Sequence, residues 1–322
     1  MTAALFFCAS AYAATGLSAN EAIEAAHRAY SAGDYAKAVQ ILQAAAQSEP
    51  RNGEIHLLLA KSYYEMEDRD RAVVSAETAV SIDPKSSVFH EWLGRAYGEK
   101  ADHSGWFSAL SLAKKARREF DTAVRLDERN FSVMQALIEF DCSAPGIAGG
   151  GEDKALVEIQ KIAALDAAEG HYALGNCRRQ KKDFAVADSE FTKALETQPK
   201  SADLVYDIGD YAMKRGQVDR LAAVVETGEK LNPSDPRVNF YRAVLYILRN
   251  EKLDEAEKLI REYLSKTPRR NSYPSPSMAH YWLGRLFEGQ NQTQAAVSEY
   301  ETAVKLDSRN KYASESLKRA KK

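Results

Sequence analysis

The sequence predicts an all-α fold, a right-handed superhelical solenoid of helix-turn-helix repeats. The first observation is that prolines recur 34 or 35 residues apart, at Pro50 and Pro84 and again at Pro199, Pro233 and Pro268. The second is an Ala-x-x-x-apolar-x-x-Ala pattern ahead of several of these prolines. The third is an upstream Leu-Gly or Leu-Ala pair followed by an aromatic residue. A fixed period of this length is typical of helical units that stack on their neighbours.

Each period contains two predicted helices, because small and apolar residues recur at helical spacing in two segments. The first helix carries Leu59-Ala60 with Tyr63, Leu93-Gly94 with Tyr97, and Leu283-Gly284 with Phe287. The second carries Ala38, Leu42 and Ala45; Ala72, Ala76 and Ala79; Ala187, Phe191 and Ala194; and Ala296, Tyr300 and Ala303. Gly33 and Gly216 are expected to form left-handed turns between the two helices, and proline ends the second.

These positions resemble the tetratricopeptide repeat (TPR) family, in which an aromatic-x-x-Leu-Gly-x-x-Tyr helix precedes Ala-x-x-x-Phe-x-x-Ala and then proline. The resemblance covers residues 19–310 and implies a solenoid whose concave face binds other proteins. Gly or Ala at the eighth position of a repeat is expected to let its two helices approach closely. Alignment gives eight repeats, over residues 19–52, 53–86, 87–130, 131–167, 168–201, 202–235, 236–276 and 277–310.

Two insertions interrupt the period on neighbouring repeats. Residues 102–111 are expected to lengthen the second helix of the third repeat by roughly two to three turns, with Ser104 as its N-cap. The glycine-rich segment 143–154 replaces the turn between helices in the fourth repeat. We expect this loop to fold over the lengthened helix, with Ile147 covering Trp106.

Three further segments lie outside the regular repeats. Residues 269–277 (RRNSYPSPS) are basic and then proline-rich, which is typical of a short semi-rigid spacer. Residues 311–322 form a predicted amphipathic helix that caps the open end of the solenoid. Residues 1–18 contain a twelve-residue apolar run, Ala3 to Ala14, which is too short to cross a bilayer.

The run ends in Ala11-Tyr12-Ala13, the small-x-small form of a signal-peptide cleavage site. It therefore predicts export, to the periplasm or out of the cell. No Lys or Arg precedes Arg28, so the basic start of a signal peptide is missing, as it would be if the true start lay upstream. The alternative is an N-terminal arm that packs on the first helix pair of a cytoplasmic protein.

Composition and charge exclude several classes of protein. Forty-four Lys and Arg residues against 46 Asp and Glu residues give a formal charge of -2, so no positive field favours nucleic acid. The three cysteines are neither paired as CxxC nor dense, which argues against zinc and a disulfide framework. Cys142 and Cys177 fall on the first helices of adjacent repeats. We predict that they are free and buried. A disulfide needs Cα atoms within about 7 Å, which is closer than the axes of adjacent first helices normally bring them.

No pattern of residues indicates a cofactor, a metal or a catalytic centre. Gly146 and Gly151 match the glycines of a phosphate-binding loop, but Glu152 stands where its lysine should be. Four histidines occupy the fourth position of a first helix and are expected to pack rather than to bind metal: His56, His90, His171 and His280. The prediction is a protein that is not an enzyme and has no cofactor.

The concave groove is the predicted partner-binding site. The resemblance places one aromatic series at the fifth position of the first helices, Tyr172, Tyr206, Phe240 and Tyr281, and a second at the sixth, Trp92, Tyr241 and Trp282. Charged residues lie among them, including Arg95, Arg285, Glu139, Asp207 and Asp210. Rigid rings with interspersed charge are typical of peptide-binding surfaces. The alternative is that part of this series is core between helices.

The leading function is therefore an interaction scaffold or adaptor that binds a protein or peptide segment in the groove. The second candidate is an envelope assembly or trafficking factor that holds an apolar ligand or lipid there. No membrane span and no nucleic-acid partner are expected.

Overall fold

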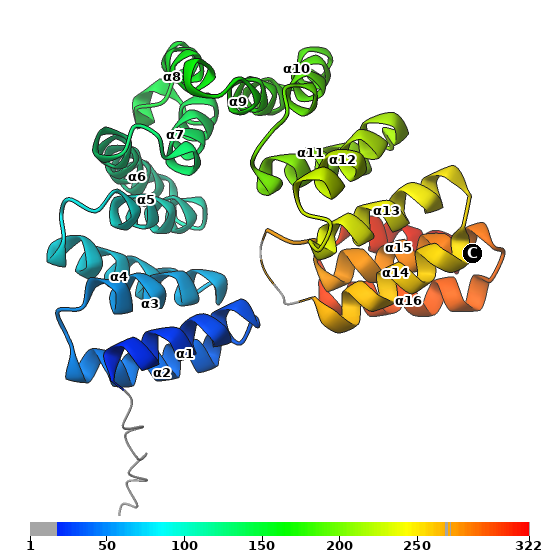
Figure 1. Cartoon of the computed structure of the whole chain (residues 1–322), viewed down its shortest axis with the longest axis horizontal. Helices are drawn as coiled ribbons and strands as arrows, with labels where there is room; N and C mark the ends of the chain where they lie inside the picture. The colour runs from blue at the N-terminus through cyan, green and yellow to red at the C-terminus, as the bar shows by residue number, and fades with distance from the viewer. Residues whose placement is uncertain (1–17, 268–269, 271, 322) are drawn as a thin grey trace, which may run out of the picture.

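The computed structural model describes residues 18–267, 270 and 272–321, which form an all-α solenoid of helix pairs and confirm the predicted fold class (Figure 1). No strand occurs in these ranges. The predicted signal segment lies almost entirely outside the described residues. The helices are α1 (Ala19–Ser31), α2 (Tyr35–Ser48), α3 (Gly53–Glu65), α4 (Arg69–Ile82), α5 (Ser87–Asp102), α6 (Trp106–Leu126), α7 (Phe131–Ser143), α8 (Glu152–Leu165), α9 (Ala167–Gln180), α10 (Phe184–Glu196), α11 (Ala202–Lys214), α12 (Val218–Leu231), α13 (Pro236–Arg249), α14 (Leu253–Lys266), α15 (Pro276–Gly289), α16 (Thr293–Leu306) and α17 (Lys311–Ala320).

Odd-numbered helices up to α15 are the first helices of successive pairs, and all of them begin in the same way. A short polar side chain accepts a hydrogen bond from a backbone N–H of the first turn, which otherwise has no partner. The same cap begins α17, which packs against α15 and α16. The capping residues are Ser18, Asn52, Ser86, Asn130, Asp166, Ser201, Asp235, Ser275 and Asn310.

The predicted left-handed turns are present, with φ of 76° at Gly33 and 64° at Gly216. The equivalent turns of other repeats place Glu67, Lys182 and Asn291 at φ of 58°, 62° and 61°. The geometry of the turn is therefore common to these repeats, and glycine only makes it less strained.

Glycines at the eighth position of three repeats set the spacing within the helix pair, as predicted. A Cβ atom on Gly94 would lie 2.7 Å from ring carbons of Phe120, and one on Gly284 would lie 2.4 Å from the ring of Tyr300. Gly175 meets Phe191 in the same way, at 2.6 Å. These contacts are shorter than any real carbon contact, so only glycine permits the observed packing.

Two glycines of the same helix should therefore respond oppositely to alanine. Gly94→Ala is expected to lower the free energy of unfolding by about 1 to 3 kcal/mol, because the ring of buried Phe120 must shift. Gly98→Ala should raise it by about 0.5 to 1 kcal/mol, because nothing lies within 4 Å of the new methyl group and alanine favours the helix. Urea unfolding measures both variants. Equal effects would contradict the assigned close contact.

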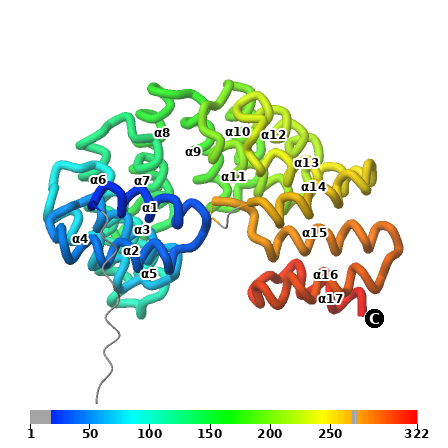
Figure 2. Tube along the Cα trace, turned by 60° about the horizontal axis from the view of Figure 1, so that its bottom comes forward, coloured from blue at the N-terminus to red at the C-terminus, as the bar shows by residue number. Residues whose placement is uncertain are grey.

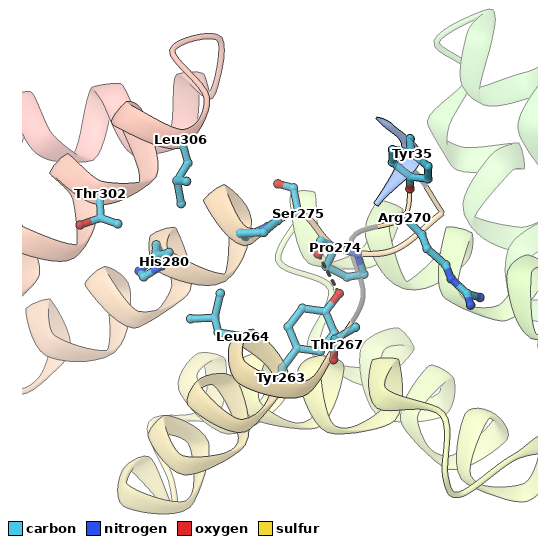
Figure 3. Close-up of a pocket in the computed structure, with 11 residues that line it drawn as sticks. Tyr35, Tyr263, Leu264, Thr267, Arg270, Pro274, Ser275, His280, Thr302 and Leu306 are labelled. Atoms are coloured by element: carbon cyan, nitrogen blue, oxygen red, sulfur yellow. Dashed lines mark hydrogen bonds between the residues drawn. The ribbon is translucent and has the colours of Figure 1, made fainter. Parts of the chain in front are cut away.

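The superhelical path brings the first repeat beside the last ones (Figure 2). A pocket of about 420 Å³ lies between them, lined by Tyr35 of α2, by Arg270 and Pro274 of the spacer, and by residues of α14 to α16 (Figure 3). Tyr263 donates a hydrogen bond to the carbonyl of Pro274 at 2.7 Å, which ties the spacer to α14. None of the described helices combines the length and the apolar character that a membrane span requires.

The third repeat contains the lengthened helix that the sequence predicts, α6, with 21 residues. The N-cap, however, is Gly105 and not Ser104, whose hydroxyl instead donates to the carbonyl of Lys100 at the end of α5. The prediction that Ile147 covers Trp106 is also wrong. The two side chains are 64% and 68% exposed.

The glycine-rich loop is held by other contacts. It buries Ala148 against the fold, and the N–H of Gly151 donates to the carbonyl of Asp141 at 2.9 Å. Asp141 is itself buried and paired with Arg117 of α6 at 2.9 Å. These anchors place the loop against the middle of α6, and so the first turn of α6 projects beyond it.

Candidate partner-binding groove

The first helices line the inner side of the arc (Figure 1). Two adjoining pockets form a groove along them. One, of about 560 Å³, lies between α5, α6 and α7; mostly apolar side chains line it, among them Trp106, Leu110 and Phe140. We call it the apolar pocket. The other, of about 520 Å³, runs from α7 past α9 to α11 and α13, and we call it the acidic pocket. Arg95, Ala136 and Glu139 line both pockets, which makes the groove continuous.

Five carboxylates line the acidic pocket: Glu139, Glu169, Asp203, Asp207 and Asp210. Tyrosine hydroxyls fix two of them, since Tyr172 donates to Asp207 and Tyr241 donates to Asp210, each at 2.6 Å. The single basic side chain of the lining is Arg95, and it is already engaged by Glu91 and Ser132. The pocket is therefore strongly negative.

The carboxylates differ in how their charge is compensated. Asp203 pairs with Arg237 at 2.6 Å, and Glu169 accepts a hydrogen bond from Gln135 at 2.9 Å. Glu139, Asp207 and Asp210 form no ion pair with any described residue within 4 Å. Neighbouring protein atoms reduce the hydration of Glu139 and Asp210, which raises the pKa of both carboxyls, and the negative charge of Asp207 raises both pKa values further. Glu139 nevertheless remains open to the groove.

Replacing Asp210 with Asn tests this electrostatic strain. Because the pKa of Asp210 is raised in the folded protein, its negative charge destabilises the fold at pH values above that pKa. This loss of folding free energy disappears as the pH falls toward the ordinary pKa of 3.8. Lys214 and Arg179 lower the pKa, as does the hydrogen bond from Tyr241, which an asparagine oxygen can still accept. Asp210→Asn should therefore melt at a higher temperature than the wild type at pH 7, with a smaller difference near pH 4. A lower melting temperature at pH 7 would contradict the assignment.

Most of the predicted aromatic series lies in the core instead of facing the groove. Phe240 and Tyr241 are 0% and 1% exposed, and Tyr206, Tyr281 and Trp282 are buried as well. The ring of Tyr206 stacks on Tyr241 of the next repeat at 5.4 Å, and Phe240 contacts Tyr263 of its own repeat at 5.1 Å. Their exposure was predicted wrongly because large side chains at these positions fill the space between successive helix pairs.

The remaining predicted site residues divide among different places. Arg95 and half-buried Tyr172 line the acidic pocket, where the edges of Tyr206 and Tyr241 also contribute. Tyr281, Trp282 and Arg285 line a separate pocket of about 330 Å³ near α17. Trp92 is half-buried, and the ammonium of Lys61 lies 4.9 Å from its ring. The alternative of an apolar ligand or lipid gains no support, because five carboxylates line the acidic pocket and three acidic side chains, Glu99, Asp102 and the shared Glu139, line the apolar pocket.

Sequence reasoning missed four acidic residues that line the groove: Glu99, Asp102, Glu169 and Asp203. The signal was present on one helix, because Asp203, Asp207 and Asp210 recur at helical spacing on α11. It was obscured by arginines such as Arg179, which made the charge of the groove look mixed.

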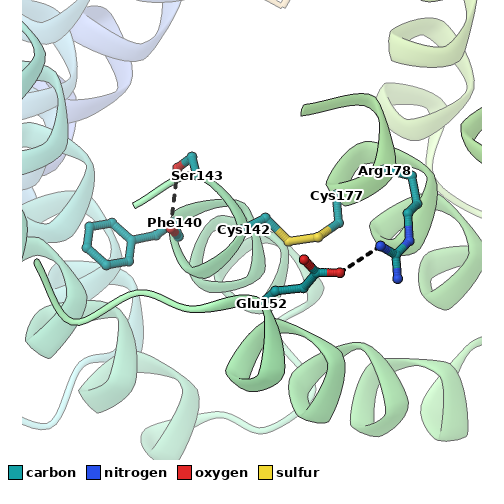
Figure 4. Close-up of a disulfide and its surroundings, with 6 residues drawn as sticks. All are labelled: Phe140, Cys142, Ser143, Glu152, Cys177 and Arg178. Carbon is teal, nitrogen blue, oxygen red and sulfur yellow. Dashed lines mark hydrogen bonds and ion pairs between the residues drawn. A yellow bond between two sulfur atoms is a disulfide. The ribbon is translucent and has the colours of Figure 1, made fainter. Parts of the chain in front are cut away.

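Cys142 and Cys177 form a disulfide between α7 and α9, which corrects the prediction that both are free (Figure 4). Their Cα atoms are 5.5 Å apart. Packed helix axes lie about 8 to 10 Å apart, but each Cα that faces the neighbour lies about 2.3 Å nearer to it. Facing positions on adjacent first helices are thus within disulfide range. Beside the bond, Arg178 and Glu152 join α9 to α8 at 2.6 Å (Figure 4).

The four histidines at the fourth position serve packing. Nδ1 of His90, His171 and His280 lies 2.6 to 2.7 Å from a carboxylate of the second helix in the same repeat, and His56 contacts the carbonyl of Pro50. No group of three or more possible metal ligands occurs in the described part of the chain.

Comparisons with known proteins agree with this architecture. Family models described as tetratricopeptide repeat match residues 29–97, 168–201, 206–271 and 248–311, which together span well over half of the chain. No curated protein matches the sequence.

Among solved structures, the chain is similar to a tetratricopeptide repeat protein from Parabacteroides merdae, at 17% identity and a TM-score of 0.47, covering 94% of this chain and 99% of that one. It is also similar to the human IFIT1 dimer with PPP-AAAA, at 17% identity and a TM-score of 0.51, covering 92% and 71%. The APC/C hetero-tetramer Cut9-Hcn1 gives 14% identity and a TM-score of 0.50, covering 94% and 56%. The last two likenesses show the fold alone. The repeat pattern, the helix pairs and the matching family models together establish that the chain belongs to the tetratricopeptide repeat family.

Proposed function

We propose that the chain is a non-enzymatic scaffold or adaptor that holds a segment of a partner protein in the groove formed by the two pockets. The observation that carries this proposal is the continuity of the groove across five first helices, α5 to α13. A groove of this length suits an extended segment better than a small molecule, which occupies a single enclosed pocket.

The chemistry of the groove supports binding over catalysis. The residues that line the two pockets include no histidine, cysteine or lysine, the side chains that most often act as bases or nucleophiles near neutral pH. Two of the carboxylates are held by tyrosine hydroxyls, which orient them toward a bound cationic group without supplying a reactive partner.

Site-specific photo-crosslinking in the native organism tests the proposal. A photoreactive amino acid in place of Ser132, an exposed residue of the groove, should capture a defined partner protein. The same amino acid in place of Lys258, an exposed residue of α14 outside both pockets, is the matched control. Capture of the same protein at both positions, or only at Lys258, would refute binding in the groove.

We also propose that the protein is exported to the periplasm or secreted. Two independent features support this location: the signal-like segment of residues 1–18, and the disulfide between Cys142 and Cys177, which persists in oxidising compartments. Expression from the full native gene, followed by fractionation and mass spectrometry, should give a mature N-terminus near Ala14. An intact N-terminus on protein recovered from the cytoplasm, with both cysteines reduced, would refute export.

A further inference from the structure

We infer that the partner segment is an extended basic peptide, with one large apolar side chain for the apolar pocket and Lys or Arg side chains for the acidic pocket. This inference rests on the proposed function, because it specifies which segment the groove accepts. It follows from the charge, the exposure and the spacing of the two pockets.

The charge of the groove is the first argument. Seven carboxylates and one arginine line the two pockets, the acids being Glu99, Asp102, Glu139, Glu169, Asp203, Asp207 and Asp210. Glu99 is paired with Arg69 and Asp203 with buried Arg237, and neither arginine lines a pocket of the groove. Asp102, Glu139, Asp207 and Asp210 have no ion pair with a described residue within 4 Å, so a cationic side chain of a partner could form ion pairs with them.

The acidic side chains are also oriented to receive a cation. Tyr172 and Tyr241 each bond one oxygen of an aspartate, which leaves the second oxygen of Asp207 and of Asp210 without a hydrogen bond from a described residue. Asp207 and Asp210 lie three residues apart on α11 and therefore on one face of the helix. Two fixed carboxylates on one face match a Lys or Arg side chain, for which charge-assisted hydrogen bonds are strong.

The apolar pocket supplies the second argument. Trp106 stands at its rim and is 68% exposed, beside the 87%-exposed Phe107. Leu110, Phe140 and Pro145 form the wall next to it. A Trp side chain left open over an apolar pocket is the usual form of a binding anchor, whose truncation weakens complexes about tenfold to a hundredfold.

The spacing of the pockets sets the length of the segment. Three steps between adjacent first helices separate α5 from α11, and each step is about 8 to 10 Å. The distance of roughly 25 to 30 Å corresponds to about eight residues of extended chain. The anchor and the basic residues should therefore stand about eight positions apart.

A selection from a random peptide library on the whole protein, followed by titration of the best fluorescent peptides, tests this inference. We expect enrichment of Lys and Arg, together with one aromatic or long aliphatic residue about eight positions away. Asp207→Asn/Asp210→Asn should weaken these peptides at least tenfold, and Trp106→Ala should weaken them to a similar extent. Both variants should fold, because asparagine keeps the hydrogen bonds from tyrosine and Trp106 is exposed.

The matched control removes two charges elsewhere. Glu128→Gln/Asp254→Asn changes the net charge equally at exposed positions that line neither pocket, and should leave affinity unchanged within about twofold. If the selected peptides are not enriched in Lys or Arg but their binding depends on Trp106 or Ser132, the inference is wrong and the proposed function still stands. Peptides whose binding no groove variant affects would overturn both.

Discussion

Ala187→Glu is expected to lower the free energy of unfolding by about 3 to 5 kcal/mol, enough to unfold much of the fifth repeat. Ala187 is 0% exposed and belongs to the core that Phe191 and Ala194 form with the next helix pair. A carboxylate there would lose its hydration without gaining an ion pair, and the longer side chain would also force the two helices apart. Circular dichroism during urea unfolding measures the loss.

The matched variant is Ala185→Glu, two residues earlier on the same helix. Ala185 is exposed in the first turn of α10, where a negative charge interacts favourably with the helix dipole. It should therefore leave stability unchanged or raise it by about 0.5 kcal/mol. If the two variants melted alike, the face of α10 assigned to the core would be wrong.

The repeats could be predicted because their key positions allow few alternatives. Alanine at Ala187 or Ala194 and glycine at Gly94 mark places where helices pack too closely for larger side chains, and small residues recur at the equivalent positions of most repeats. Where sterics exclude large side chains, the sequence has Ala or Gly at a fixed spacing, and this pattern can be recognised without knowing the neighbouring structure. The repeat pattern therefore indicated the fold class directly.

The groove could be predicted only in part, because aromatic residues suit a core and a binding surface equally well. Phe240 and Tyr172 occupy equivalent positions, yet Phe240 is fully buried and Tyr172 reaches the groove with its hydroxyl. The difference lies in the neighbouring side chains, since the ring of Phe240 packs against Tyr241 and Tyr263. Carboxylates such as Asp207 were the better guide, because a charged side chain is rarely buried without a partner.

The irregular segments were the hardest to predict. The position of Ile147 depends on hydrogen bonds of Gly151 and on the pair between Asp141 and Arg117, which join segments far apart in the sequence. The repeat pattern does not predict these contacts. The exposure of Trp106 followed from them, and so the apolar pocket emerged only from the structure.

Replacing both Cys142 and Cys177 with alanine is expected to lower the free energy of unfolding by about 3 to 4 kcal/mol. The bond joins residues 35 positions apart, and closing a loop of this length restricts the unfolded chain by about that amount. Both cysteine side chains are buried, so the disulfide of the folded protein should resist mild reductants. Reduction should proceed only when the protein unfolds locally or globally. Urea unfolding with and without reductant measures the two effects.

Two comparisons make the disulfide prediction decisive. In the wild type, adding reductant during unfolding should lower the midpoint to nearly that of the double alanine variant, whereas the variant itself should not respond. Because the bond joins α7 to α9, two of the helices that line the acidic pocket, its loss should also weaken peptides that depend on Asp207. A wild type that is insensitive to reductant at every urea concentration would show that the two cysteines are not linked in solution, and would remove one of the two supports for export.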